Sequence, residues 1–308
     1  MTVLVSTWSM NLTNATNSTV EAGSDHVTLG IVLFCIIESV FAVICNVLLL
    51  IVFFKNPYKD MRGTVSMLIF NVTLCDLLSA CVFIIWNTSH WWRCPTWLYK
   101  VINVGLWIPV LTSILTLLVL SFERYIVVKW PWKESQLITK RRTVVACATT
   151  WIVSIVLCVT LKNNQTIFLL VLSTVIEISV FIQVLFYVLL WRQRKSEELS
   201  SATQLDQREQ RQLTLVVFLL VVLVIVTILP QVISYQMFAA LTLMQKLPET
   251  EDRLSYVVFY LLPLYSANFL LDPIIYAWRL KKYRKSFFAV FWKKEQPRVI
   301  DIEIKLFI

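Results

Sequence analysis

Seven long apolar stretches constrain the fold of this chain more than any other feature. Each is close to, or above, the roughly 20 apolar residues that an α-helix needs to cross a bilayer. The stretches lie at about 28–54, 65–87, 98–123, 143–161, 166–191, 213–239 and 254–278. We therefore expect an all-α membrane protein, built as a seven-transmembrane helix bundle.

The composition excludes several classes of function. The 308 residues are 58% hydrophobic and only 15% charged, and the mean hydropathy is +0.72. A soluble chain is typically about half apolar and a quarter charged. A soluble enzyme, a nucleic-acid binder and a disordered scaffold are therefore poor interpretations. The sequence also lacks a phosphate-binding loop and metal-ligand spacing, so we expect neither an enzyme nor a bound cofactor.

The basic residues predict the topology, because lysine and arginine are retained on the cytoplasmic side. With the N-terminus outside, 22 of the 28 basic residues fall in cytoplasmic segments and five fall outside. This predicts a multi-pass plasma-membrane protein with an extracellular N-terminus. The basic loops would contact anionic membrane lipids, which accounts for the net charge of +9 without nucleic acid.

The segments outside the spans divide into three parts. Residues 1–27 carry no basic residue but three sequons, so we expect an extracellular tail glycosylated at Asn11, Asn14 and Asn17. No cleaved signal peptide is apparent, and the first span would act as the insertion signal. Residues 279–293 place aromatic and basic residues at helical spacing, which predicts an amphipathic eighth helix in the membrane interface. Residues 294–308 would form a cytoplasmic tail.

Polar residues inside spans are costly and often mark function. Here they fall in short motifs, each in its own span. The third span ends Ser121-Phe-Glu-Arg-Tyr125, and the seventh reads Asn268-Phe-Leu-Leu-Asp-Pro-Ile-Ile-Tyr276. The other spans carry, in order, Asn46, Asp76, Trp151, Tyr187 and Pro230. With these motifs in this order, residues 28–292 resemble a rhodopsin-like (class A) G-protein-coupled receptor.

The resemblance implies roles for these residues. Glu123 and Arg124 would form an ion pair with an exchangeable partner, so that the arginine can meet a heterotrimeric G protein. The activation switch would comprise Glu123, Arg124, Tyr125, Tyr187, Asp272, Pro273 and Tyr276. Pro230 and Pro273 remove helix hydrogen bonds and would permit the kinks on which the motion depends. An allosteric sodium ion, the one metal ion we expect, would have as its ligands Asp76, Ser113, Asn268 and Asp272.

The sequence departs from the family pattern at several positions. Tyr99 stands where a third-helix cysteine is usual, and Cys94 has no partner in the outer loops, so we expect no structural disulfide. Ser179 replaces a fifth-helix proline, and Ile228 replaces the sixth-helix tryptophan. Most of these departures are similar to the melanocortin, sphingolipid, cannabinoid and adenosine receptor cluster, although the missing tryptophan fits none of its members well.

The class of ligand can be narrowed mainly by excluding known classes. Leu106 stands where amine receptors carry an aspartate, which argues against an amine ligand. Ser266 stands where opsins carry the lysine that binds retinal, which argues against a retinal photoreceptor. An aromatic, weakly polar set remains in the outer half, and it favours a small hydrophobic or lipid-like ligand. These ligand-pocket candidates are Trp86, Asn103, Trp107, Tyr235 and Tyr265. Ordinary packing of the bundle is the alternative for each aromatic side chain.

The sequence is compatible with three functions to different degrees. The first is a receptor that activates G proteins in response to an extracellular signal. The second is a non-signalling decoy or dimerisation partner that regulates other receptors, which the departure at Ile228 favours. The third is a small transporter, which should show an internal repeat or broken helices with charges at the midplane. Neither feature is visible in the sequence.

Overall fold

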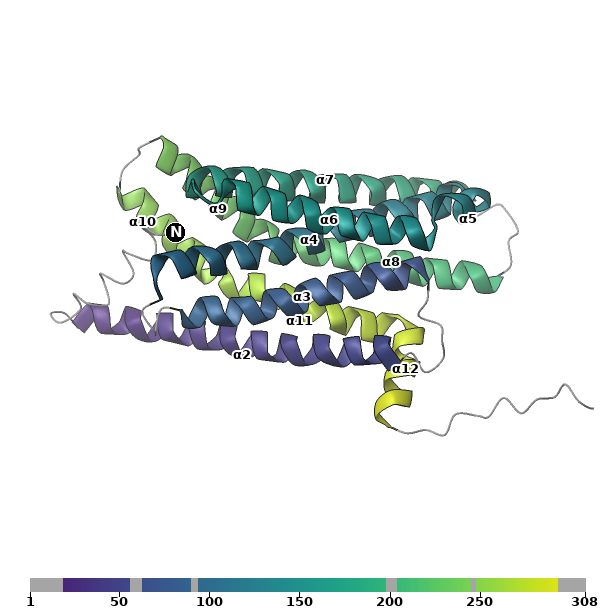
Figure 1. The fold of residues 1–308 in the computed structure, drawn as a ribbon, viewed down its shortest axis with the longest axis horizontal. Coiled ribbons are helices and arrows are strands. Elements are labelled where there is room, and N and C mark those ends of the chain that lie inside the picture. Colours follow the sequence, from purple (N-terminus) through teal and green to yellow (C-terminus); the bar gives the residue numbers. More distant parts are fainter. Residues whose placement is uncertain (1–18, 56–62, 90–93, 198–203, 245–247, 293–308) are drawn as a thin grey trace, which may run out of the picture.

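The computed structural model describes residues 19–55, 63–89, 94–197, 204–244 and 248–292, and every regular element in these ranges is helical. Figure 1 shows a bundle of long helices with one short helix turned across its end. The first helices are α2 (Thr19–Lys55), α3 (Thr64–Thr88), α4 (Thr96–Lys129), the 3-10 turn η1 (Pro131–Lys133) and α5 (Glu134–Leu137). The others are α6 (Lys140–Leu161), α7 (Gln165–Glu197), α8 (Gln204–Thr227), α9 (Leu229–Leu243), α10 (Pro248–Tyr260), α11 (Leu262–Arg279) and α12 (Lys281–Phe291).

The seven predicted spans are confirmed. Seven stretches of the described chain are long and apolar enough to cross a membrane, and they run from Thr28–Lys55 to Leu254–Arg279. The third span is longer than the predicted 98–123, because its helix continues past Glu123 to Lys129. We call the end of the bundle with Arg124 the inner end and the end with Lys162 the outer end, after the predicted topology. The inner end lies on the right of Figure 1.

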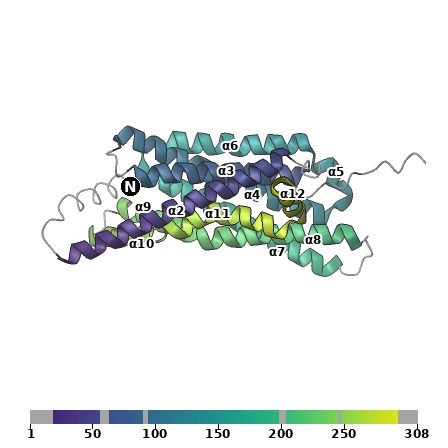
Figure 2. The same cartoon turned by 90° about the horizontal axis from the view of Figure 1, so that it is seen from below.

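Helix α4 forms the centre of the bundle. It packs against α3, α6, α7 and α8, and 67% of its most apolar window is buried. For α6 the buried share of that window is only 17%. Large apolar side chains on α6, such as Val145 and Ile152, are exposed and would face lipid. The view in Figure 2 places α6 along one edge of the bundle.

Buried amide and indole groups tie α3 and α6 to this central helix. The indole nitrogen of Trp151 donates to the Asn71 side-chain oxygen at 3.0 Å. The Asn71 amide nitrogen in turn donates to the Thr116 hydroxyl at 2.8 Å. Asn71 is therefore a buried structural residue, and a chain of hydrogen bonds fixes the spacing of three helices at this point.

Two prolines interrupt the sixth and seventh spans. Proline lacks a backbone N–H and its ring clashes with the preceding turn. The sixth span accordingly breaks between Thr227 and Leu229, next to Pro230, as the sequence predicts. The seventh breaks at Leu261, next to Pro263, which the sequence reasoning missed. A kink was also expected at Pro273, but α11 continues through this residue as one helix.

The eighth helix, α12, follows directly after α11. Leu280 between them is extended, with φ −92° and ψ 107°, so the chain turns at this residue. Tyr283 is buried, and its ring contacts Phe53 of α2 edge-on at 5.3 Å between centroids. Desolvation raises the pKa of the Tyr283 phenol, although a hydrogen bond with Ser66 opposes the shift. The exposed Phe288 and Trp292 give α12 an apolar surface suited to a membrane interface.

Candidate functional site

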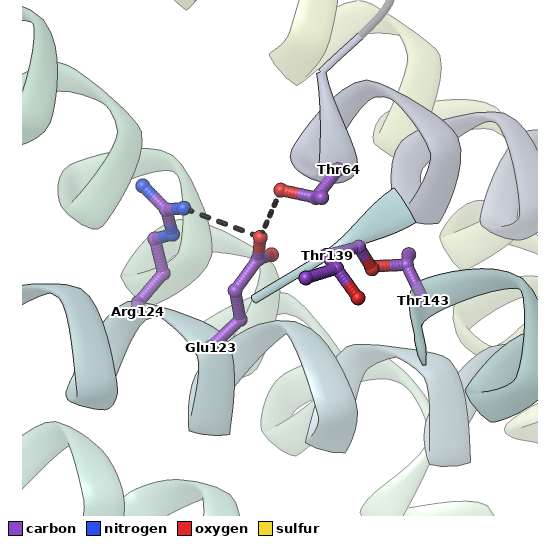
Figure 3. Close-up of polar contacts among 5 residues, drawn as sticks. All are labelled: Thr64, Glu123, Arg124, Thr139 and Thr143. Atoms are coloured by element: carbon purple, nitrogen blue, oxygen red, sulfur yellow. Dashed lines mark hydrogen bonds and ion pairs between the residues drawn. The ribbon is translucent and has the colours of Figure 1, made fainter. Parts of the chain in front are cut away.

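The inner end of α4 holds a buried ion pair. An Arg124 guanidinium nitrogen lies 3.6 Å from a Glu123 carboxylate oxygen, and the two side chains are only 3% and 5% exposed. The Thr64 hydroxyl, at the first residue of α3, donates to the same oxygen (Figure 3). Because a buried charge needs a partner, the pair is stable only while both groups remain together or find substitutes. Two groups therefore compete for one carboxylate oxygen.

A hydroxyl close to this pair makes a different contact. Figure 3 also shows Thr139 and Thr143, where α6 begins. The Thr143 hydroxyl donates to the backbone oxygen of Thr139 at 3.2 Å, and the Thr139 hydroxyl accepts the N–H of Arg142 as a helix cap. The Thr143 hydroxyl bonds only a carbonyl at the start of its own helix. Thr143 is therefore a matched control for Thr64, whose hydroxyl bonds the ion pair.

Tyr125 lies in a separate environment from the ion pair. Its hydroxyl accepts a hydrogen bond from the Lys129 ammonium at 2.8 Å, and its ring contacts Phe186 of α7 at 5.5 Å. The same ammonium lies over the Trp130 ring, 4.4 Å from its centroid. Tyr125 thus links the inner ends of α4 and α7 through packing.

The other predicted switch residues lie on the helices around α4. Tyr187 of α7 stacks on Phe218 of α8 with centroids 4.3 Å apart, which joins these helices near the inner end. Tyr276 of α11 is fully buried. Pro273 and Asp272 are buried in the same helix. The structure therefore distributes the predicted switch over α4, α7 and α11 and does not gather it into one cluster.

A polar cluster lies inside the bundle. The Ser113 hydroxyl donates to an Asp76 carboxylate oxygen at 3.3 Å, and the carboxyl groups of Asp76 and Asp272 interact with one another. Asn268, the fourth predicted member, accepts a hydrogen bond from Thr227 of α8 at 3.2 Å. Asp76 is thus at the centre of the cluster, bonded to Ser113 and close enough to Asp272 for their charges to interact. Asn268 connects α11 to the sixth span.

The donor set of this cluster fits a hard cation. One oxygen of Asp76 and both oxygens of Asp272 are buried and have no hydrogen-bond partner within the described chain. Two buried carboxylates require a proton or a cation to offset desolvation and repulsion. Hard cations prefer oxygen ligands. These residues could therefore hold a sodium ion.

The four aromatic ligand-pocket candidates are packed together in the outer half. The Trp107 ring contacts Tyr235 edge-on at 5.6 Å and Tyr265 at 6.3 Å. Trp86 stacks on Phe83 at 5.8 Å. All five candidates are buried. The aromatic members fill the space between the helices, which corresponds to the packing alternative.

A groove lies beside this aromatic cluster, at the outer end. Its lining includes Tyr99, Lys100, Asn103, Lys162, Gln165 and Phe168. Asn103 alone was among the sequence candidates. The signal that sequence reasoning missed is Lys100, one helical turn before Asn103, together with a second lysine in the short connection before α7.

The comparisons with known proteins agree with this architecture. Residues 45–162 match the 7 transmembrane receptor (rhodopsin family). Over these residues, the chain is similar to the rhodopsin family. The matched region runs from the first span to the end of α6 and contains Arg124. The chain is accordingly a multi-pass membrane protein.

Three curated relatives are similar over parts of the chain. Human chemokine XC receptor 1 is 29% identical over 126 residues, 40% of this chain and 37% of that receptor. A QRFP-like peptide receptor of Branchiostoma floridae is 32% identical over 137 residues, 43% and 35% of the two chains. An allatostatin-A receptor of Bombyx mori is 27% identical over 112 residues, 35% and 30%. The matches span well under half of each relative. The likeness to the melanocortin and lipid receptor cluster stays a prediction.

Proposed function

We propose that this chain is a G-protein-coupled receptor that passes an extracellular signal to a heterotrimeric G protein. The observation that carries the proposal is the buried Arg124, held by a Glu123 oxygen that Thr64 also uses. A buried ion pair at a helix end is an exchangeable contact, because the arginine can leave only for another stabilising partner. The G protein would supply that partner. No enzymatic activity is proposed.

The break in the sixth span offers a route by which a signal would reach Arg124. The sixth span is divided at Ile228 into α8, which packs on α4 and α11, and α9, which packs on α7. A ligand that changes the packing of α9 would alter the angle between α9 and α8. The Tyr187–Phe218 stack and the Thr227–Asn268 bond would then rearrange. An agonist shifts this equilibrium by binding the active arrangement more tightly.

Sodium bound by Asp76, Ser113 and Asp272, with Asn268 beside them, would stabilise the inactive arrangement. The receptor would lie in the plasma membrane with its N-terminus outside. The glycosylation candidates Asn11, Asn14 and Asn17 fall outside the described residues. The ligand would be a small hydrophobic or lipid-like molecule that acts on the aromatic cluster around Trp107.

Ligand-free activation of G proteins tests the proposal. Wild-type chain and Arg124→Ala are compared at equal surface expression, across the main G-protein subtypes. We expect a basal signal that the variant loses. Arg141→Ala is the matched control, because Arg141 is an exposed arginine at the start of α6. Equal loss in both variants would contradict the assigned role of Arg124.

A second candidate is a decoy that reaches the surface without signalling. Ile228 in place of the usual tryptophan favours it, since this residue stands at the break in the sixth span. Thr64→Val and Glu123→Gln, which weaken the inactive pair, distinguish the two candidates. A receptor should signal more strongly in both variants. Silence in both, with normal surface expression, would favour the decoy.

A further inference from the structure

One carboxyl group of α7 lies deep in the membrane without being fully buried by the bundle. Glu177 belongs to the fifth span, Gln165–Gln193. At a rise of about 1.5 Å per residue it lies about 18 Å from Gln165, well inside a hydrocarbon layer about 30 Å thick. Its side chain is partly exposed. An ionisable group at this depth is costly and needs a specific partner.

Gln236 of α9 supplies part of what this carboxyl group needs. With its nitrogen turned toward Glu177, the amide donates to one carboxyl oxygen at 2.6 Å and to the other at 3.1 Å. Helices α7 and α9 pack against one another, in the upper part of Figure 1. Gln236 is also partly exposed. The pair therefore lies at the boundary between the two helices.

The residues around the pair form a surface that faces lipid. Ile178 and Phe181 of α7 are exposed, and Phe181 lies one helical turn from Glu177. On α9, Ile233 and Met237 are exposed in the same way. Residues three or four apart share a helix face, so the polar pair lies within an apolar patch. We call this patch the α7–α9 surface, and it comprises Glu177, Ile178, Phe181, Ile233, Gln236 and Met237.

The bond between Glu177 and Gln236 leaves hydrogen-bonding capacity unused. A carboxylate can accept about four hydrogen bonds, and a glutamine amide has two donor hydrogens and an oxygen with two lone pairs. Lipid tails offer neither donors nor acceptors. The Thr174 hydroxyl, one turn away, donates to the Leu170 backbone oxygen of its own helix at 2.8 Å. A protein surface laid against the pair would satisfy the remaining groups, and such polar contacts hold transmembrane helices together.

The α7–α9 surface is complementary to itself. It presents an acceptor and a donor side by side, and because these groups are bonded they lie at the same depth. Two copies of the chain share one topology, so a two-fold axis along the membrane normal keeps that depth. Rotation about this axis brings the acceptor of each copy to the donor of the other, using the same patch on both subunits. A partner with donors alone would satisfy only the carboxyl group.

We propose that the α7–α9 surface is the interface of a homodimer. Glu177 of each copy bonds Gln236 of the second copy and keeps its bond within its own chain. Phe181 and Met237 pack around these four groups and exclude lipid tails. The interface uses neither Arg124 nor the aromatic cluster around Trp107, so it does not depend on the proposed receptor function.

Dimer formation is measured with the purified full chain in phosphatidylcholine vesicles. Energy transfer between donor-labelled and acceptor-labelled copies is followed as added lipid dilutes the protein, which gives a dissociation constant in the membrane. Glu177→Leu should raise this constant about tenfold, because it removes a bond from each half of the symmetric contact. Gln236→Leu should do the same. The double variant should dimerise no more weakly than either single variant, since both changes remove the same bonds.

Two further variants isolate the contribution of the hydrogen bonds. Glu177→Gln combined with Gln236→Glu exchanges the two groups and should restore dimer formation. Thr149→Leu is the matched control and should leave the dissociation constant unchanged, because Thr149 is exposed on α6 and its hydroxyl bonds a carbonyl of its own helix. If the leucine variants lowered the melting temperature but left the dissociation constant unchanged, the pair would only join α7 to α9 within one copy, and the proposal would be wrong.

Crosslinking keeps the interface testable even if the leucine variants fail to fold. Met237→Cys places a thiol on the α7–α9 surface, and a short bifunctional maleimide should link two copies there. Ile152→Cys, on the exposed face of α6, should give no more product than the wild type, whose own cysteines set the background. Equal crosslinking at both positions would overturn the assigned interface. A wild-type chain that stays monomeric at every protein-to-lipid ratio would overturn the dimer itself.

Discussion

The two ends of α4 stabilise the bundle in different ways. At the inner end, Arg124 and Glu123 are held by charge, and the Thr64 hydroxyl shares the same oxygen. In the outer half, Trp107 is held by ring contacts with Tyr235 and Tyr265. An ion pair can exchange one partner for another of the same charge. Packed rings have no equivalent substitute, so the outer half responds to shape and the inner end responds to charge.

The difference indicates where a signal would enter and leave. A ligand that moves an aromatic ring changes packing that extends over three helices. A G protein that offers a new acceptor to Arg124 competes with one carboxylate. Substitutions at one end therefore test whether the packing or the activity at the other end changes.

Removal of Trp107 should have the largest effect. Trp107→Ala should lower the free energy of unfolding by about 3 kcal/mol, because a buried ring is lost and a cavity is left. Thermal unfolding in detergent measures this change. Trp97→Ala removes an exposed tryptophan from the same helix and should lower stability far less. Equal losses in the two variants would contradict a packed aromatic cluster.

Neutralising Glu123 should raise basal signalling about tenfold. Glu123→Gln removes the charge that holds Arg124, and a hydrogen bond to a charged group is worth about 1.5–3 kcal/mol. Differential stabilisation of that size shifts a two-state population at least tenfold. Basal nucleotide exchange on the G protein is the measurement.

Glu38→Gln is the matched variant from another part of the bundle. Glu38 accepts a hydrogen bond from Ser266 at 2.5 Å, between α2 and α11. Its loss should leave basal activity near the wild-type level. If Glu38→Gln activated as strongly as Glu123→Gln, the switch would not be local to the inner end of α4.

Thr64→Val should raise basal signalling about fivefold, less than Glu123→Gln does. The substitution removes a hydroxyl from the shared carboxylate oxygen but leaves the ion pair intact. A single hydrogen bond contributes about 1 kcal/mol. Thr143→Val serves as the control, since its hydroxyl bonds a carbonyl of its own helix end. If Thr143→Val raised basal signalling and Thr64→Val did not, the assigned role of Thr64 would be wrong.

The smallest expected effect concerns sodium. In the wild type, exchange of potassium for sodium should lower basal activity and raise the melting temperature by a few degrees. Asp76→Asn should abolish both responses, and Ser113→Ala should only weaken them, since Ser113 contributes one hydroxyl. A sodium response that survives in Asp76→Asn would exclude this cluster as the ion site.

Much of the fold could be predicted because the membrane imposes a length and a polarity on each span. The seven spans, the break beside Pro230 and the helix at 281–291 follow from local sequence. The break beside Pro263 was missed, although a proline in an apolar run was a visible signal. The Glu123–Arg124 pair was accessible because its residues are adjacent.

Contacts between distant residues could not be predicted in the same way. Thr64 meets Glu123 across 59 positions, and Trp151 meets Asn71 across 80. Nothing in either local sequence specifies the other. For the outer half, the sequence identified the correct aromatic residues, but the structure packs these rings against one another and leaves the groove beside them.

The sequence by itself determined that the chain is a seven-helix membrane bundle and that it resembles the rhodopsin family, because hydrophobic length and a few spaced polar residues are properties of single segments. Tertiary structure alone decided which carboxylate Thr64 shares, that Asp76 and Asp272 lie close together, and that Lys100 and Lys162 line the same groove at the outer end. The reason is physical. A span is selected by its transfer into lipid, one helix at a time, whereas a site forms only when side chains from several helices occupy the same small volume.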